Sequence, residues 1–209
     1  QICHVWRPDE APHRSHRCVI LMSMKLVILD RDGTINHERD DYIKSSEEWV
    51  PLPGSMEAIA RLNHAGWHVV VATNQSGIGR GLFDMAALNA MHAKMHQILA
   101  RHGARVDAVF FCPHTPEDQC SCRKPQPGLF NMIGERFGVS LDGVPMVGDL
   151  PRDVLAAQSV GCEPHLVRTG QAASMTEAEL VALRRQVPDL TIHPDLSSFA
   201  DFVILRDRR

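Results

Sequence analysis

The sequence predicts an α/β fold, namely a Rossmann-like, doubly wound, mostly parallel sheet with helices on both faces. Two observations lead to this prediction. From Met24 onward, short β-rich apolar runs alternate with longer helical segments, and such alternation implies parallel strands joined by right-handed crossovers. The composition is that of an ordinary globular protein, because 44% of the 209 residues are hydrophobic and 22% are charged. A chain of this kind can form one good core.

The individual elements follow from apolar runs and from the residues that bound them. The run "KLVILD" reads as a buried strand that ends in a carboxylate. Pro53 and Gly66 bound one helix, and Asp84 and Gly103 bound a longer one, as expected for residues at helix starts and ends. The expected strands are 25–30, 67–74, 106–112, 144–149 and 164–170. The expected helices are 53–66, 84–103, 128–138, 152–161, 176–187 and 195–204.

The first 23 residues differ from the rest of the chain. They mix Pro, Arg and His without a helical or alternating period. We expect residues 1–23 to be a poorly ordered extension, a misassigned start or a remnant of cloning. We expect residues 24–209 to form a single domain.

Composition and charge disfavour several classes of function. The net charge of −3 gives no basic field for nucleic acid. No apolar run approaches the roughly 20 residues of a membrane span, and Lys25 interrupts the apolar run before the first strand. Six cysteines are too few for a disulfide scaffold. We therefore expect a cytoplasmic protein without a membrane or nucleic-acid partner. We also expect a monomer, on which the sequence itself is silent.

Polar residues follow the ends of successive predicted strands. Asp30 and Asp32 follow the first strand, Thr73 and Asn74 end the second, and Asp149 ends a later one. Ligands of parallel sheets bind beyond the carboxyl ends of the strands. These side chains are therefore expected to meet at one edge of the sheet.

The stretch "DRDGTIN" can aim two carboxylates in one direction. Asp30 and Asp32 are two residues apart, and Gly33 permits a sharp turn that brings backbone N–H groups towards a ligand. An Asx-turn that merely caps a loop is the structural alternative. Asp149 adds a carboxylate that suits Mg²⁺, while Thr73 and Lys124 suit phosphate oxygens.

This ordered set, DxDGT, Thr73, Lys124 and GDxxxD, resembles the four motifs of the haloacid dehalogenase superfamily of phosphohydrolases. The resemblance implies that Asp30 attacks phosphorus and that Asp32 acts as general acid and then as general base. It implies Mg²⁺ held by Asp30, the carbonyl of Asp32 and Asp149. The remaining implied site residues include phosphate contacts and the supporting carboxylate Asp153. The phosphate and substrate contacts are Arg31, Thr73, Asn74, Gln75, Ser76, Arg123 and Lys124.

The stretch "CPHTPEDQCSC" has the pattern C-x-H-x5-C-x-C, formed by Cys112, His114, Cys120 and Cys122. Three cysteines and a histidine are a standard structural zinc set with no open catalytic position. A C-x-C pair cannot easily close as a disulfide. The pattern predicts structural Zn²⁺, with unliganded loop cysteines as the alternative.

An insertion of this kind before the Lys124 motif resembles one branch of the superfamily, which includes heptose bisphosphate phosphatases and histidinol-phosphate phosphatases. The resemblance implies removal of the 7-phosphate from a heptose 1,7-bisphosphate, with Arg123 in substrate recognition. Histidinol phosphate is the alternative substrate. A polynucleotide 3′-phosphatase and a non-catalytic, zinc-stabilised binding module are more distant alternatives. The substrate is expected to be a small phosphorylated sugar in lipopolysaccharide or glycan synthesis.

The segment 36–49 is too short for a large cap domain. We expect a minimal cap, formed as a small flap in which Asp41 and Tyr42 touch the substrate. Arg80 in "SGIGRG" is a further candidate phosphate contact on a flexible loop. His92 and His96 have metal-ligand spacing but no third ligand nearby, so exposed or packed histidines are the favoured interpretation.

Overall fold

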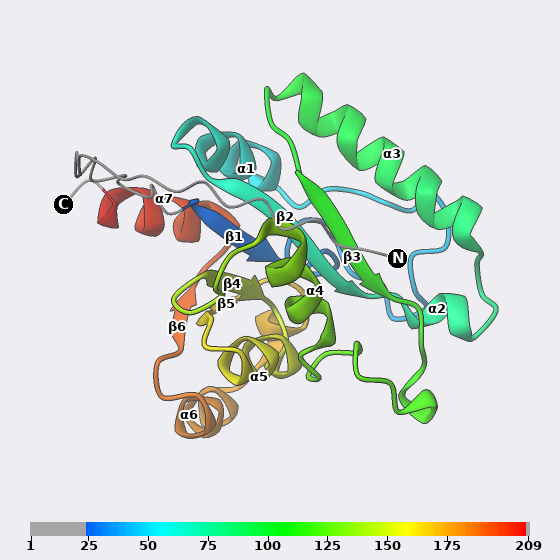
Figure 1. The fold of residues 1–209 in the computed structure, drawn as a ribbon. Coiled ribbons are helices and arrows are strands. Elements are labelled where there is room, and N and C mark those ends of the chain that lie inside the picture. The colour runs from blue at the N-terminus through cyan, green and yellow to red at the C-terminus, as the bar shows by residue number, and fades with distance from the viewer. Residues whose placement is uncertain (1–23, 208–209) are drawn as a thin grey trace, which may run out of the picture.

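The computed structural model describes residues 24–207, and its centre is a sheet of six parallel strands in the order β3-β2-β1-β4-β5-β6 (Figure 1). The predicted α/β fold is confirmed. The expected extension 1–23 lies outside the described residues. The strands are β1 (Leu26–Leu29), β2 (His68–Asn74), β3 (Ala108–Cys112), β4 (Pro145–Gly148), β5 (Glu163–Val167) and β6 (Thr191–His193).

Helices cover both faces of this sheet because successive strand residues point to opposite sides. In β1, Val27 and Leu29 join one hydrophobic cluster, whereas Leu26 and Ile28 join another. The first cluster lies against α1 (Ser55–His64), α3 (Met85–Arg101) and α7 (Leu196–Arg206). The second lies against α4 (Gly128–Phe137) and α5 (Pro151–Ser159), and a third cluster joins α5 and β5 to α6 (Glu177–Gln186).

The start of α3 shows the local chemistry that was expected from the sequence. Asp84 is the N-cap, and its side chain accepts a hydrogen bond from the Ala87 amide at 2.9 Å. This bond satisfies one of the amides that a helix start leaves without a partner. Gly103 follows the helix with a φ of 65°, a conformation that glycine adopts without steric cost.

Two elements differ from the sequence expectation. The three-residue strand β6 was not predicted, because a run this short carries no readable alternation; it forms through its register with β5. A flexible loop was expected at 76–81, but residues 76–79 form one helical turn, α2 (Ser76–Gly79).

The connection between β1 and α1 contains no inserted domain within the described residues. Asn36 forms isolated bridges with Asp32 and with Pro51, and the rest of the segment is irregular. The expected minimal cap is thus confirmed. None of the helices in the part of the chain that the structure describes is long and apolar enough to cross a membrane.

Candidate active site

The strand order reverses at β1, whose neighbours are β2 on one side and β4 on the other. Ligands of doubly wound sheets bind at such a switch point. Asp30 is the first residue after β1, and its amide donates to the Val147 carbonyl of β4 at 2.8 Å. Asp149 is the first residue after β4. The two carboxylates therefore meet at the carboxyl edge, as expected from the strand ends.

Glycines let the backbone approach these carboxylates closely. Gly33 has a φ of 80°, and a Cβ atom at this position would overlap the carboxylate of Asp149. A Cβ atom at Gly170, whose φ is 51°, would overlap the same carboxylate. Only glycine satisfies both the backbone conformation and the space. The tight turn in "DRDGTIN" is thus built around Asp149, which lies 116 positions after Gly33 in the chain.

Lys124 is a buried cation at this edge. Its Nζ lies 2.9 Å from Asp30 Oδ1 and 2.8 Å from Asp153 Oδ1, and it donates to the Ala72 carbonyl at 2.7 Å. Burial would lower the pKa of Lys124, but Asp153 and Asp30 outweigh that effect and raise it. The amide and carbonyl of Lys124 are held by the side chain of Asn74, at 3.0 Å each. The ammonium is therefore charged and rigidly placed.

The carboxylates outnumber this cation. Oxygen atoms of Asp30, Asp149 and Asp153 lie within 4.8 Å of one another. Burial, with Asp153 and Asp30 nearby, raises the pKa of Asp149 to about 9. Burial also raises the pKa of Asp30 to about 6, although Lys124 opposes this shift. Raised pKa values of two of the three carboxyl groups mean that the cluster is destabilised when all three are ionised without a further cation.

A divalent cation fits this donor set. Asp149 Oδ2 accepts from the Gln171 amide at 2.8 Å, while its Oδ1 is buried with no hydrogen-bond partner. Asp153 is already engaged, since its Oδ2 accepts from the Leu150 amide at 3.0 Å and its Oδ1 faces Lys124. Carboxylate oxygens with an open position are what Mg²⁺ requires. Asp149 and Asp30 suit direct ligation, and Asp153 suits support.

Asp32 lies beside the cluster in a different environment. Both of its oxygens accept from the Arg31 guanidinium, at 3.0 Å each, and they accept further bonds from Asn36 at 2.9 Å and Gln75 at 2.8 Å. Burial would raise the pKa of Asp32, but the charge and hydrogen bonds of Arg31, with the other two donors, lower it. The loop that carries Asp30 and Asp32 therefore places one carboxyl with a raised pKa near another with a lowered one.

A cavity of about 260 Å³ opens over these groups. Eight predicted site residues line it, namely Asp30, Asp32, Tyr42, Thr73, Asn74, Gln75, Ser76 and Arg123. Six lining residues were not predicted, namely Glu38, Arg39, Asp40, Ile43, Arg152 and Gln171.

Some of these missed residues had a signal in the sequence. Glu38, Arg39 and Asp40 lie in the expected flap, and Arg152 lies inside the GDxxxD motif. Gln171 had none, because it comes from the loop after β5. Its side chain donates to Glu38 at 2.6 Å and joins that loop to the flap.

Three predicted contacts lie elsewhere. Asp41 is exposed and pairs with Arg39 at 2.9 Å and Lys44 at 2.6 Å. The guanidinium of Arg80 lies 3.9 Å from Glu117 and does not line the cavity. The side chain of Arg31 is fully buried beneath Asp32. The roles expected for these residues stay predictions.

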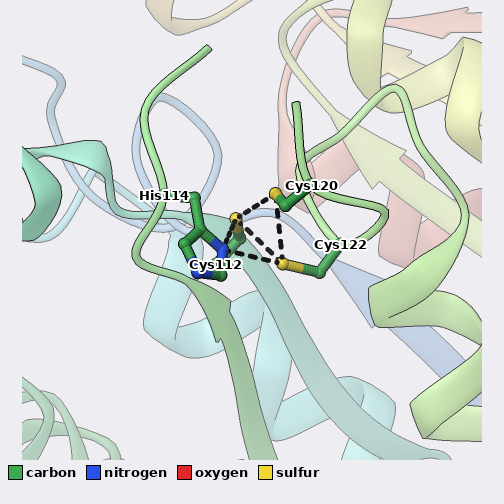
Figure 2. Close-up of side chains that lie close together, drawn as sticks. All are labelled: Cys112, His114, Cys120 and Cys122. Carbon is green, nitrogen blue, oxygen red and sulfur yellow. Dashed lines mark hydrogen bonds between the residues drawn. The ribbon is translucent and has the colours of Figure 1, made fainter. Parts of the chain in front are cut away.

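The four residues of the cysteine stretch converge, as Figure 2 shows. The Sγ atom of Cys122 lies 3.1 Å from that of Cys112 and 3.4 Å from that of Cys120, and 3.3 Å from Nδ1 of His114. All three thiols are free. A tetrahedral site with zinc–sulfur bonds of about 2.3 Å separates its donors by roughly 3.8 Å. The donor atoms here are somewhat closer together than that. A small outward movement of the side chains would give them the spacing of zinc ligands.

Arg123 connects this cluster to the cavity. It follows Cys122 directly, its Nη1 donates to the His114 carbonyl at 3.3 Å, and it lines the cavity. The buried Lys124 comes next. The cysteine stretch therefore contacts Arg123 and leads directly into Lys124.

Comparisons with known proteins agree with this geometry. A family model described as polynucleotide kinase 3 phosphatase matches residues 25–149, and one described as HAD-hydrolase-like matches residues 121–198. D-glycero-beta-D-manno-heptose-1,7-bisphosphate 7-phosphatase of Pseudomonas aeruginosa is 49% identical over 88% of this chain and 99% of its own length. The enzyme of that name from Bordetella bronchiseptica is 59% identical over 70% of this chain and 82% of its own length.

A solved structure shows the same relationship. The D,D-heptose 1,7-bisphosphate phosphatase from B. bronchiseptica, crystallised with magnesium and phosphate, aligns with a TM-score of 0.79. It is 48% identical, and the match covers 88% of this chain and 99% of that one. This chain therefore belongs to the HAD-like phosphatases and, within them, to the D-glycero-D-manno-heptose-1,7-bisphosphate 7-phosphatase family.

Proposed function

We propose that this protein is a Mg²⁺-dependent phosphomonoesterase that removes the 7-phosphate from D-glycero-D-manno-heptose 1,7-bisphosphate. The observation that carries the proposal is the buried Asp30–Lys124–Asp149 cluster beneath a cavity lined by Arg39, Arg123 and Arg152. Asp30, as the nucleophile, and the fixed ammonium of Lys124 can bind one phosphate group. The surrounding guanidinium groups suit a second anionic group.

The reaction would proceed through Asp30. A carboxylate oxygen of Asp30 attacks phosphorus, and the bond from phosphorus to the sugar oxygen breaks. Asp32 donates a proton to that leaving oxygen. Asp32 then takes a proton from water, whose oxygen attacks the phosphorus of the aspartyl-phosphate. Inorganic phosphate leaves, and both carboxyl groups return to their initial state.

The environment of Asp32 suits both halves of this cycle. Its pKa is lowered by Arg31 with Asn36 and Gln75, so the free enzyme holds an ionised base. The negative charge of a bound phosphate raises the pKa of a neighbouring carboxyl. Substrate binding therefore favours the protonated acid that the first half requires.

Phosphate oxygens would be held by groups at the ends of β1 and β2 and by Lys124. The side chains of Thr73 and Ser76 lie at the cavity wall, with Asn74 and Gln75 between them. The backbone N–H of Arg31 belongs to this set. Mg²⁺ bound by Asp30, the Asp32 carbonyl and Asp149 would neutralise phosphate charge and lower the repulsion between the phosphate and Asp30.

Selectivity would come from Arg123 and the flap. The flap residue Tyr42 lines the cavity, while Asp41 holds Arg39 and Lys44. Asp41 would then contribute by shaping the flap. The guanidinium of Arg80 would reach the phosphate only if it first moved away from Glu117.

The cysteine cluster would bind structural Zn²⁺ through Cys112, His114, Cys120 and Cys122. Four protein ligands leave no position for catalysis. We further propose that residues 24–209 act as a single, monomeric domain. The protein would work in the cytoplasm on a precursor for lipopolysaccharide or glycan synthesis.

One observation favours a second candidate, a polynucleotide 3′-phosphatase, because that family model spans Asp30 to Asp149. Bases of nucleic acids are usually bound by stacking on aromatic side chains. Among the described residues that line the cavity, Tyr42 is the one aromatic side chain. The net charge of −3 also opposes polynucleotide binding.

The deciding experiment compares kcat/KM for heptose 1,7-bisphosphate, histidinol phosphate and a 3′-phosphorylated oligonucleotide at one Mg²⁺ concentration. The heptose substrate should exceed the others by at least about 100-fold, since site-specific polar contacts give large discrimination. A preference for either competitor would replace the substrate assignment. If none of the three substrates is hydrolysed, the result would support a non-catalytic binding module.

A further inference from the structure

Arg31 is a fully buried arginine with two partners. Its Nε and Nη2 donate to the two oxygens of Asp32, at 3.0 Å each. Its Nη1 lies 3.2 Å from Nε2 of His92, which belongs to α3. The guanidinium therefore bridges the nucleophile loop and a helix that packs on the sheet.

The direction of the second bond follows from the chemistry of the groups. A guanidinium has only donors, so Nε2 of His92 must accept and the imidazole proton must lie on Nδ1. Burial, with the charge of Arg31, lowers the pKa of His92 to about 4. A neutral ring is what the contact requires.

The side chain of Arg31 has few other restraints. Within residues 24–207, its side chain hydrogen-bonds only to Asp32 and His92. Asp32 belongs to the same tight loop and has Gln75 as a side-chain partner outside that loop, so by itself it does not fix the guanidinium to the helices that pack on the sheet. His92 does, because α3 is held by the core residues Leu88, Met91 and Met95.

We propose that His92 is a positioning residue for acid–base catalysis. By accepting the Nη1–H of Arg31 it fixes the plane of the guanidinium, and the guanidinium aims the carboxylate of Asp32. This inference rests on the proposed function, which gives Asp32 the acid–base role. His92 does not line the cavity and acts only through Arg31. Misplacing a catalytic group by a fraction of an ångström lowers the rate without abolishing binding.

Three variants test the inference. His92→Leu removes the acceptor but keeps much of the volume, whereas His92→Gln keeps an acceptor in its side-chain amide oxygen. His96→Leu is the matched control, since His96 is exposed one turn later on the same helix. Melting curves establish folding, and the smaller His92→Ala replaces His92→Leu if the latter does not fold.

The readout separates proton donation from general damage. With enzyme in excess, the first-turnover release of the leaving group is measured for an alkyl phosphate and for p-nitrophenyl phosphate. An alkoxide needs a proton to leave, whereas p-nitrophenolate does not. His92→Leu should slow the alkyl phosphate about tenfold, as expected when part of a general-acid contribution is lost. It should change p-nitrophenyl phosphate by less than about twofold, with little change in KM.

His92→Gln and His96→Leu should both stay within about threefold of wild type on the alkyl phosphate. Equal losses on the two substrates, equal losses in the Leu and Gln variants, or no loss in the Leu variant would each overturn the positioning role. The alkyl series includes heptose 1,7-bisphosphate and glycerol phosphate. Wild-type turnover of glycerol phosphate alone would overturn the substrate assignment while leaving the test of His92 intact.

Discussion

The carboxylate cluster and the cysteine cluster are held in place by different means. Asp30 and Asp149 follow buried strands, and Lys124 lies between Asp30 and Asp153 with its charge compensated. In the cysteine cluster, only Cys112 ends a strand and is buried, whereas His114 is exposed.

This difference shows two ways to place chemical groups. A sheet edge positions its carboxylates through backbone pairing, so the site exists before a ligand binds. A short loop has too little apolar surface to bury, and it needs a cross-link to keep one conformation. The cysteine loop would obtain that cross-link from a metal. A changed charge in the sheet-edge cluster should therefore lower activity or stability, and loss of the metal should lower the stability of the cysteine loop.

The largest effect is expected for Asp30→Asn. The variant lacks the nucleophile, so kcat for phosphate release should fall by at least about 10⁴-fold. The fold should remain, because Asn has nearly the same volume and Lys124 keeps Asp153 as a partner. Activity is measured as phosphate release and folding as the melting temperature. Asp201→Asn, on the exposed side of α7, is the matched control, and a fully active Asp30→Asn enzyme would refute the mechanism.

A large loss of stability is expected for Lys124→Met. The substitution leaves Asp30 and Asp153 buried without their cation, and breaking a buried pair costs about 3–5 kcal/mol. The free energy of unfolding is measured with urea. Lys44→Met is the control, because the Lys44–Asp41 pair is more exposed and surface pairs contribute about 0–1 kcal/mol. Equal losses in the two variants would mean that the sheet edge does not depend on this charge.

Removal of zinc should act mainly on stability. Chelation followed by restoration of Mg²⁺ should lower Tm by roughly 5–10 °C, which corresponds to about 2–3 kcal/mol, and should lower activity through the displaced Arg123 and Lys124. The Cys122→Ser variant should show a similarly lowered Tm and activity. Cys162→Ala alters a buried thiol outside the cluster and should not change the response to chelator. An unchanged Tm in a sample shown to be free of zinc would rule out the structural role.

The smallest effect is expected for Arg123→Ala, which alters the residue between the two clusters. Its guanidinium lines the cavity and contacts the His114 carbonyl. We expect kcat/KM for the bisphosphate to fall about tenfold, mainly through KM, as for a lost contact to an anionic substrate. Tm should change little. Arg105→Ala at an exposed position is the control, and an equal loss on a monophosphate substrate would separate Arg123 from recognition of the second phosphate.

Local patterns in the sequence predicted the order of five strands and of the main helices. Alternation, apolar runs and bounding residues such as Asp84 and Gly103 are properties of neighbours in the chain, so they can be read without a structure. The meeting of Asp30, Thr73 and Asp149 was predicted in the same way, because parallel strands end at one edge. The cysteine stretch was legible because its four residues lie within eleven positions.

Only the tertiary structure decided which distant groups complete the site. Gln171 contacts Asp149 across 22 positions of the chain, and Arg31 bonds to His92 across 61 positions. The strand β6 pairs with β5 although no local pattern marks it as a strand. A lone glutamine or histidine carries no information about its partner. The sequence by itself therefore determined the fold class and the residues that can perform chemistry. The packing of α3 and of the loop after β5 determined how those residues are oriented, because that orientation depends on contacts between residues far apart in the chain.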